Sequence, residues 1–370
     1  MSKKNKKIIN RKPIFYICIL VIFIYSFIGS KGDLIENLNI PIGIGYDLKG
    51  EEYDIYILTL EDEQSDVKAK LRNGSALNIA ETREKRSTKS SKKFIVGLEK
   101  IYILSEKQSE KGLKTIIDVW INNPQVNDRG LIAVCSGKSK DILMYTKNQS
   151  TNAAEYLEGI IKNLNQFNFF SKQFTVTDLM VRADAEGRNP ALPYIDITKD
   201  GLATTGLALF KGDKMMGKTN LEEAKYINLL KYDKLKGILT IQKNMKEYIS
   251  FYTKSRKKVK CYKKDGKYNF VINLNLEGDI TNNQLYLGLN KDKEKLKKFT
   301  KDMEKEVKDD CNYYIDKIQN EYKFDVLGLG KYAAAKYGRK KGIDWNKEVV
   351  NSNIEVNVKV KVKNQGRGDY

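Results

Sequence analysis

The chain has 370 residues, of which 41% are hydrophobic and 31% charged, a composition typical of folded globular proteins rather than disordered ones. At about 150 residues per domain, this length predicts two to three domains. The absence of histidine excludes serine–histidine and cysteine–histidine nucleophiles, histidine zinc sites and histidine proton shuttles. The net charge of +20 indicates either attraction to nucleic acid or anionic membranes, or a lysine-rich surface with interspersed acids, and we favour the second for most of the chain.

The N-terminus combines a basic segment with an apolar one. Residues 1–12 contain six lysines and arginines and no acid, and 18 uncharged residues follow from Pro13 to Ser30. A helix of that length reaches about 27 Å, close to the roughly 30 Å of a bilayer core. The site for signal peptidase near its end is weak, and a buried core helix fits poorly with the basic flank. We predict a cytoplasmic segment over 1–12 and an uncleaved transmembrane anchor over 13–30, with the remaining chain extracytoplasmic.

Residues 31–198 are predicted to form an α/β domain. The pattern indicates a β-hairpin over 40–60, then a polar stretch over 61–93 that is either a loop or an exposed helix near 75–85. A strand over 94–104, a helix over 105–122 and a buried strand over 131–135 follow. A second amphipathic helix lies within 148–170, with Ser150 as its N-cap. Strands that alternate with helices are typical of α/β units.

A change of composition at residues 182–199, which hold two of the five prolines, marks the predicted boundary between two domains. The second domain, 199–370, is predicted to contain a hairpin over 206–216, a helix over 221–235 capped by Asn220, and strands over 237–242 and 268–276. A long amphipathic helix over 290–322 and a strictly alternating strand from Ile354 to Val362 complete it. The predicted fold class is therefore multi-domain α/β (α+β), with mixed sheets, flanking helices and a C-terminal antiparallel sheet packed by the long helix.

Residue types that carry chemistry form no catalytic pattern. Neighbouring carboxylates point about 100° apart on a helix, so they are interpreted as solvated surface groups rather than a dyad; these pairs are Asp309-Asp310 and Glu222-Glu223. Residues 252–262 interleave cations with aromatics. This stretch is either a phosphate or lipid-headgroup patch or a solvent-facing edge strand guarded by lysines, and we favour the edge strand.

The cysteines also indicate no active site. Cys18 lies in the apolar segment, and the other three have no zinc-ligand spacing and allow at most one internal disulfide. Cys135 and Cys311 are predicted to be buried apolar fillers, and Cys261 has no assigned role. We expect no catalytic, cofactor-binding or metal-binding residues.

Four stretches, in this order, resemble the Ger(x)C family, the C subunits of the nutrient germinant receptors of spore-forming Firmicutes. They are Ile40 to Asp47 (IPIGIGYD), Phe94 to Leu143, Leu207 to Gly217 (LALFKGDKMMG), and Phe324 to Gly330 (FDVLGLG) with Trp345 and the strand from Ile354. The resemblance implies an α/β fold in several domains and a non-catalytic role. It also implies a place on the outer face of the inner spore membrane, beside the A and B subunits of the receptor.

The sequence departs from the family pattern at three places. Ser30 stands where the family's lipobox has the cysteine that receives diacylglycerol, and a hydroxyl cannot form that thioether, so no lipid attachment is expected. Leu98 replaces a histidine, and the family's R-D-P turn reads Asn122-Asn123-Pro124 here.

The main hypothesis is a membrane-anchored accessory subunit of a germinant receptor that is required for spore germination. The alternative is a tethered extracytoplasmic solute-binding protein that captures an amino acid or a sugar. An envelope hydrolase that uses carboxylates is a third, disfavoured class, and an extracytoplasmic location argues against nucleic acid as a partner. The nutrient and the surface that contacts the A and B subunits stay open.

Overall fold

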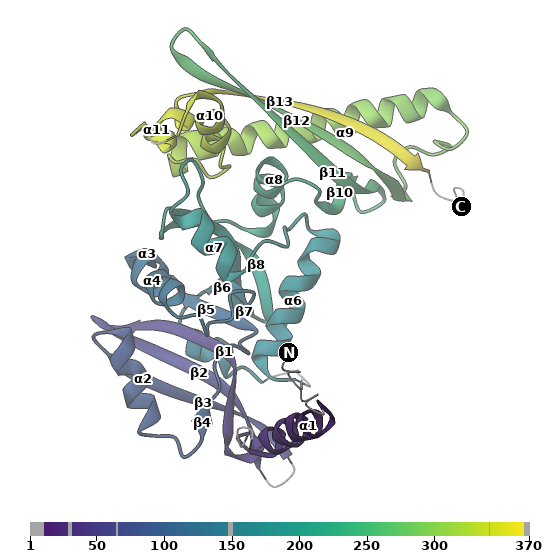
Figure 1. The fold of residues 1–370 in the computed structure, drawn as a ribbon. Helices are drawn as coiled ribbons and strands as arrows, with labels where there is room; N and C mark the ends of the chain where they lie inside the picture. Colours follow the sequence, from purple (N-terminus) through teal and green to yellow (C-terminus); the bar gives the residue numbers. More distant parts are fainter. Residues whose placement is uncertain (1–10, 29–31, 64–65, 147–150, 340, 366–370) are drawn as a thin grey trace, which may run out of the picture.

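The computed structural model describes residues 11–28, 32–63, 66–146, 151–339 and 341–365 (Figure 1). Its strands are β1 Leu38–Lys49, β2 Glu52–Glu63, β3 Asp66–Ala76, β4 Lys93–Phe94, β5 Ile101–Ser105, β6 Leu131–Cys135, β7 Ala191–Thr198, β8 Gly201–Lys211, β9 Lys214–Lys218, β10 Lys236–Asn244, β11 Glu247–Lys264, β12 Lys267–Asn283 and β13 Asn353–Asn364. Its α-helices are α1 Arg11–Ile28, α2 Ile79–Ser87, α3 Glu106–Lys111, α4 Lys114–Asn122, α5 Ser139–Leu143, α6 Ala153–Phe167, α7 Val176–Ala183, α8 Leu221–Lys231, α9 Lys293–Lys317, α10 Gly330–Tyr337 and α11 Trp345–Val350. A short 3₁₀ turn, Ile35–Asn37, precedes β1, and a π-helical turn, Ile318–Tyr322, extends α9.

The first sheet has the strand order β3-β2-β1-β5-β6-β7-β8-β9, with β4 paired to β1. Strands β1, β5, β6 and β7 run parallel at its centre. Parallel neighbours require crossover connections, which α3 and α4 provide between β5 and β6, and α5 to α7 between β6 and β7. Because helices cover both faces, β5 and β6 are buried along their whole length and consist of continuous apolar runs. The predicted α/β organisation is confirmed.

Both hairpins predicted in this part of the chain are present. β1 and β2 pair antiparallel around Gly50, and β8 and β9 pair around Gly212. The two glycines have φ of 64° and 61°, a left-handed conformation that glycine adopts without steric cost. The turns therefore fix the register of both hairpins.

The second sheet has the order β10-β11-β12-β13 and is covered by α9 (Figure 1). The prediction of an antiparallel C-terminal sheet was wrong for its last strand, because β12 and β13 pair in parallel. The chain leaves β12, passes through α9, α10 and α11, and re-enters the sheet in the same direction, as a helical crossover requires. The valine alternation predicted which face is buried, with Val356 and Val360 inside, but an alternating pattern does not fix strand direction.

Several predicted boundaries also differ from the structure. The polar stretch over 61–93 holds strand β3 before α2, and the helix over 105–122 is divided at Gly112, whose φ is 121°. The predicted cap Ser150 lies outside the described residues, and Asn152 caps α6. The proline-containing segment 182–199 includes β7, and the predicted domain boundary lies in the turn between β7 and β8 of one sheet. The division into domains at residue 198 stays a prediction.

The basic-aromatic stretch over 252–262 lies on β11, which pairs with both β10 and β12. The prediction of an edge strand was therefore wrong for its first part. Beyond Lys254, the last residue of β11 paired to β10, only β12 pairs with this strand, because β11 is longer than β10. The lysine-rich part is a local edge.

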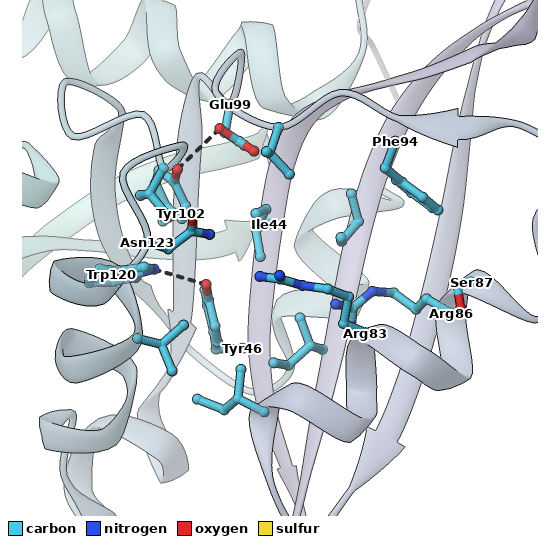
Figure 2. A pocket seen from close by; sticks show the side chains of 16 residues that line it. Ile44, Tyr46, Arg83, Arg86, Ser87, Phe94, Glu99, Tyr102, Trp120 and Asn123 are labelled. Carbon is cyan, nitrogen blue, oxygen red and sulfur yellow. Dashed lines mark hydrogen bonds between the residues drawn. The ribbon is translucent and has the colours of Figure 1, made fainter.

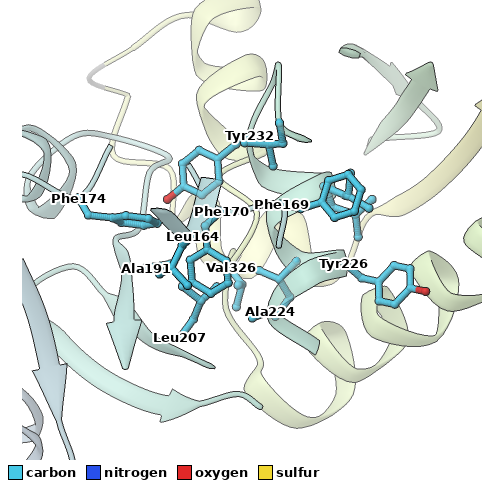
Figure 3. Close-up of a cluster of buried hydrophobic side chains, with 14 of the residues drawn as sticks. Leu164, Phe169, Phe170, Phe174, Ala191, Leu207, Ala224, Tyr226, Tyr232 and Val326 are labelled. Carbon is cyan, nitrogen blue, oxygen red and sulfur yellow. The ribbon is translucent and has the colours of Figure 1, made fainter. Parts of the chain in front are cut away.

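One hydrophobic core runs from the face of the first sheet that α5 and α6 cover to the second sheet (Figure 3). At the junction, Phe169, Phe170 and Phe174 are 0–1% exposed. Phe169 has φ of 55° and packs directly on Gly237, where a Cβ atom would lie only 2.2 Å from its ring. The amide of Phe169 also donates to the carbonyl of Lys236 at 2.9 Å. The segment after α6 is thus held tightly against the first strand of the second sheet.

The N-terminal helix α1 carries large apolar side chains that are mostly exposed, among them Phe15, Ile22 and Phe23 at 59–66%. Within the part of the chain that the structure describes, no helix is both long and apolar enough to cross a membrane. The last two residues of the predicted anchor, 29–30, lie outside that part. The anchor therefore stays a prediction.

Three cysteines are buried as free thiols, namely Cys135, Cys261 and Cys311, whereas Cys18 is exposed on α1. The prediction that Cys135 and Cys311 fill apolar space is confirmed, since both are 0% exposed and belong to the core.

Candidate functional site

A cavity of about 120 Å³ lies between α2, α4 and the first sheet (Figure 2). Its apolar wall comes from Ile44, Ile55, Ile57, Ile79, Phe94, Val96, Val119 and Val126. Its polar and aromatic lining comes from Tyr46, Arg83, Arg86, Ser87, Glu99, Tyr102, Trp120 and Asn123. An apolar pocket with a few convergent polar groups is typical of a site for a small molecule.

An aromatic cluster forms one side of the cavity. The Trp120 ring lies edge-on to Tyr46 and Tyr102, at centroid distances of 5.7 and 5.4 Å, and its Nε1 donates to the Tyr46 hydroxyl at 3.0 Å. Burial raises the pKa of Tyr46 to about 12, so the hydroxyl keeps its hydrogen at neutral pH. Because the oxygen already accepts from Trp120, this hydrogen is available to an acceptor in the cavity.

Glu99 enters the cavity from the loop before β5 and is 2% exposed. Its Oε2 accepts from the amide of Gly97 at 2.9 Å and from the Tyr102 hydroxyl at 3.3 Å. Gly97 has φ of 101°, a conformation that a residue with a side chain rarely adopts, so this loop geometry depends on glycine. Among the described residues, no donor reaches Oε1 and no cation forms an ion pair with this carboxylate.

Arg83 and Arg86 extend from α2 toward Tyr46 (Figure 2). Arg86 is 7% exposed, and its Nη1 donates to the Thr82 hydroxyl at 3.0 Å, the one hydrogen bond of this side chain within the described part of the chain. Burial, together with the neighbouring charge of Arg83, lowers the pKa of Arg86 to about 10, so the guanidinium stays protonated at neutral pH. Over the described ranges, neither arginine forms an ion pair with a carboxylate. The cavity therefore holds a buried cation and a buried anion that do not neutralise each other.

This arrangement is suited to binding a small molecule. The lining offers the guanidinium groups of α2 as hydrogen-bond donors, the Glu99 carboxylate as an acceptor, and apolar side chains around them. Among the residues that the structure describes, no group of three or more histidine, cysteine, aspartate or glutamate side chains is placed to hold a metal ion.

A second polar cluster connects the segment before β7 with α8, α11 and the segment after α9. We call it the junction, and it consists of Asn189, Lys231 and Asp325, which are buried, and of Asn346, which is half-buried. Asp325 is 1% exposed and accepts from the amides of Leu329 at 2.9 Å and Gly330 at 2.7 Å. Lys231 donates to the carbonyls of Asn189 at 2.8 Å and Val326 at 2.6 Å.

Asn189 links the junction to the β8–β9 hairpin. Its amide nitrogen donates to the Asp325 carbonyl at 2.9 Å and to Asn346 at 2.6 Å, and its oxygen accepts from the Gly212 amide at 2.9 Å. Burial lowers the pKa of Lys231 to about 7 and raises that of Asp325. The junction is a structural link, because each of its polar side chains is hydrogen-bonded to other groups of the protein.

Beside the junction lies a second cavity of about 250 Å³, lined mainly by cationic and polar groups. Its lining includes Arg182, Arg188, Lys231 and Lys331. Arg182 is paired with Asp178 at 3.2 Å, and Lys231 belongs to the junction, so part of this charge already has protein partners.

The stretches that carry the family resemblance converge on these two places. Ile44 and Tyr46 from the first stretch, and Phe94, Glu99 and Asn123 from the second, line the cavity of Figure 2. Gly212 from the third stretch and Asp325 from the fourth meet at the junction. The sequence could place these residues in motifs, but only the fold brings the motifs together.

Other residues considered from the sequence lie elsewhere. Ser30 is outside the described residues, and Leu98 is exposed at 51%. The interpretation of Glu222-Glu223 as solvated was wrong for Glu223, which is 3% exposed and bonded to Lys317 at 3.0 Å and to the Tyr322 hydroxyl at 2.9 Å.

The arginines of α2 were missed from the sequence. Asn78 caps this helix, and the side chain of Asn78 also donates to Glu81, an arrangement that signals a helix start. The buried face of α2 consists of Ile79, Thr82 and Arg86, and hydropathy does not mark such a face as buried.

Taken together, a nine-stranded α/β sheet, a second, four-stranded sheet under a long helix and a lined cavity define a two-sheet protein of the α/β class. The family model described as the spore germination protein N-terminal domain matches residues 32–197, and the model described as spore germination B3/GerAC like, C-terminal, matches residues 205–366. The chain belongs to the Ger(x)C family of spore germination proteins.

Two known proteins illustrate the relationship. Spore germination protein GerQC of Bacillus cereus is 23% identical over 367 residues, which cover 95% of this chain and 98% of that protein. The crystal structure of the GerBC protein matches with a TM-score of 0.58 at 16% identity, covering 86% of this chain and 96% of that one. The second likeness shows that the two proteins share a fold.

Proposed function

We propose that this protein is a non-catalytic accessory subunit of a nutrient germinant receptor, required for spore germination. The observation that carries the proposal is the ordered match of two spore germination family models to residues 32–197 and 205–366. Its partners in this role are the A and B membrane subunits of the receptor. It lies on the outer face of the inner spore membrane.

The proposal includes a membrane anchor over residues 13–30. The exposed side chains of α1 support it, since ten large apolar residues between Phe15 and Tyr25 are 46–78% exposed, and such a surface is unstable in water. The basic residues 1–12 stay on the cytoplasmic side. Ser30 cannot form the thioether of a lipoprotein, so no diacylglycerol is attached.

Deletion of the gene tests the accessory role. Spores of the deletion strain are expected to form normally and to lose their response to at least one nutrient. Complementation with the intact gene is the control and restores the response. A full nutrient response in the deletion strain, in the absence of a redundant paralogue, would contradict the proposal.

Mass spectrometry of the purified protein tests the anchor separately. We expect peptides from the Met1 side of the chain and no diacylglyceryl adduct. A mature N-terminus near Ser30 would show cleavage and loss of the tether.

A second candidate function, a tethered solute-binding protein, is favoured by one observation. The cavity between α2 and the first sheet holds two buried charged groups, Arg86 and Glu99, without ion-pair partners among the described residues. Calorimetry separates the two functions, because saturable heat with a small nutrient supports capture by this subunit itself.

A further inference from the structure

The second cavity, which lies beside the junction, gathers positive charge that the protein does not fully neutralise. The cationic residues of its lining are Arg182, Arg188, Lys231 and Lys331. Within the described part of the chain, no aspartate or glutamate belongs to this lining. We propose that this cavity of about 250 Å³ binds a phosphate group in its dianionic form. The inference goes beyond the receptor role and does not depend on it.

Two of the four cations already have protein partners. Arg182 forms an ion pair with Asp178 at 3.2 Å. Lys231 donates two hydrogen bonds to backbone carbonyls and interacts with the charge of Asp325. These two cations belong to the architecture of the protein and need no ligand.

Arg188 and Lys331 carry the charge that is not compensated. Among the described residues, neither side chain forms an ion pair or donates a hydrogen bond. Lys331 is half-buried, and its Nζ lies 4.9 Å from the centre of the Tyr332 ring, a contact that leaves its charge in place. Two positive charges without a counter-ion favour a ligand with two negative charges.

Backbone contacts bring these two cations side by side. The carbonyl of Gly187 accepts from the amide of Lys331 at 2.9 Å, and a Cβ atom at Gly187 would collide with that amide. The segment that carries Arg188 is therefore packed directly on the start of α10. Burial, together with the charges of Arg188 and Arg182, lowers the pKa of Lys331, which agrees with cations that lie close together. One compact dianion can interact with both.

The Tyr232 hydroxyl is a second, independent indication of a ligand. Tyr232 lines the cavity and is 8% exposed, and its hydroxyl has no hydrogen-bond partner among the described residues. The guanidinium carbon of Arg182 and the Nζ of Lys231 each lie 5.8 Å from the centre of its ring. Burial raises the pKa of Tyr232 to about 12, so the hydroxyl keeps its hydrogen at neutral pH. A buried hydroxyl without a partner is costly, and an anion in the cavity satisfies it.

The side chains of the lining that have hydrogens to spare define the chemistry of the ligand. Besides Arg188, Lys331 and Tyr232, Gln173 contributes its amide nitrogen, because its Oε1 already accepts from Arg182 at 2.6 Å. A phosphate dianion only accepts hydrogen bonds, and the planar guanidinium group matches two of its oxygens. One water needs about 10–15 Å³, so a cavity of this size has room for a phosphate group and bridging waters.

Calorimetry on the full chain in detergent tests the inference, with inorganic phosphate as the probe and chloride to hold the ionic strength constant. We expect saturable heat with phosphate. Acetate, which carries a single negative charge, is expected to bind at least about tenfold more weakly. Glycerol 3-phosphate carries the dianionic group on a larger molecule. Its binding would identify a phosphate monoester as the ligand, whereas binding of phosphate without it would identify the free anion, and both results support the site.

Three variants test the assigned contacts. Arg188→Met and Lys331→Met each remove one uncompensated charge and are expected to weaken phosphate binding by at least about tenfold. Tyr232→Phe removes only the hydroxyl and is expected to weaken it by about threefold to tenfold. Lys347→Met is the matched control, because Lys347 is exposed on α11 outside the lining and the variant loses the same net charge. Circular dichroism and thermal unfolding check that every variant is folded.

Three results would overturn the inference. Without saturable heat from phosphate, the cavity is not a phosphate site. Equal phosphate binding by the unchanged chain and by folded Arg188→Met and Lys331→Met would place the anion elsewhere on the protein. Acetate that binds as tightly as phosphate would exclude the selection of a dianion. None of these results bears on the receptor role, which gene deletion tests separately.

Discussion

The cavity and the junction both bury charged groups, but the two places differ in the protein partners that these groups have. At the junction, Asp325 and Lys231 each make two hydrogen bonds to backbone groups, and those of Lys231 connect α8 to the carbonyls of Asn189 and Val326. In the cavity, Arg86 and Glu99 both belong to the lining, and neither forms an ion pair with any of the described residues. Buried charge with full protein partners supports architecture, whereas buried charge without them marks a place where another molecule completes the site.

The largest effect is expected at the junction. Asp325→Ala removes the acceptor of two backbone amides and leaves Lys231 without the nearest opposite charge, so the free energy of unfolding should fall by about 3–5 kcal/mol. Urea unfolding followed by circular dichroism measures this loss. Asp325→Asn, which keeps one oxygen acceptor, is the control and should lose less. If Asp325→Ala lowers the free energy of unfolding by less than about 1 kcal/mol, the buried charges of the junction and of the cavity do not differ in the way described.

An intermediate effect is expected from pH. Lys257 is 8% exposed and donates to the carbonyls of Leu230 and Lys231 at the end of α8, and burial lowers its pKa from 10.5 to about 7. Between these values the unfolded chain binds more protons than the folded one, so stability rises with pH and is lost as pH falls toward 7. From pH 7 to 9 this contribution amounts to about 1–3 kcal/mol. It is measured by urea unfolding across that range.

The variant Lys257→Met identifies the group responsible. Its stability should change less between pH 7 and 9 than that of the unchanged chain, while Lys254→Met, on the same strand, should keep the full slope. An identical slope in Lys257→Met and the unchanged chain would show that this lysine stays charged in the folded protein.

The smallest effect, and the one with the opposite sign, is expected in the cavity. Without ligand, Arg86→Met removes an unpaired buried charge and adds an apolar side chain to an aliphatic wall, so stability should rise by about 1 kcal/mol. Arg72→Met removes the partner of the buried Glu61 and should lower stability instead. Thermal unfolding of the ligand-free proteins compares them. If Arg86→Met and Arg72→Met lose stability equally, the buried arginine of the cavity and the half-buried, ion-paired Arg72 do not differ in their contribution to folding.

The sequence predicted those parts of the fold whose signal is local. The alternating valines around Val358 predicted β13, and the apolar runs ending at Leu104 and Cys135 predicted buried strands. Strand direction was not predictable for β13, because period-two alternation specifies a face and not a neighbour. The strand β3, Asp66–Ala76, was missed because its residues are mostly polar and it is an edge strand of the sheet.

The candidate site was harder to predict from the sequence than the fold was. Glu99 follows Gly97 in a stretch that carries the family resemblance, yet its isolation from cations is a property of the folded chain. Arg86 was not singled out from the sequence, since a charged residue on a helix with few apolar neighbours is usually solvated. Arg86 is buried because α2 packs on β3. This packing depends on contacts between separate segments, which a local sequence pattern cannot predict.

The parallel pairing of β12 and β13 affects the order in which the second sheet can be completed. β13 can only add to β12 after α9, α10 and α11 have been synthesised, so the outer side of β12 stays uncovered until late in translation. During that interval a long strand presents free backbone donors and acceptors, which favours association between nascent chains. A chain that ends before Asn353 would lack β13, so one side of β12 would stay unpaired. Such a product would be a good substrate for proteases.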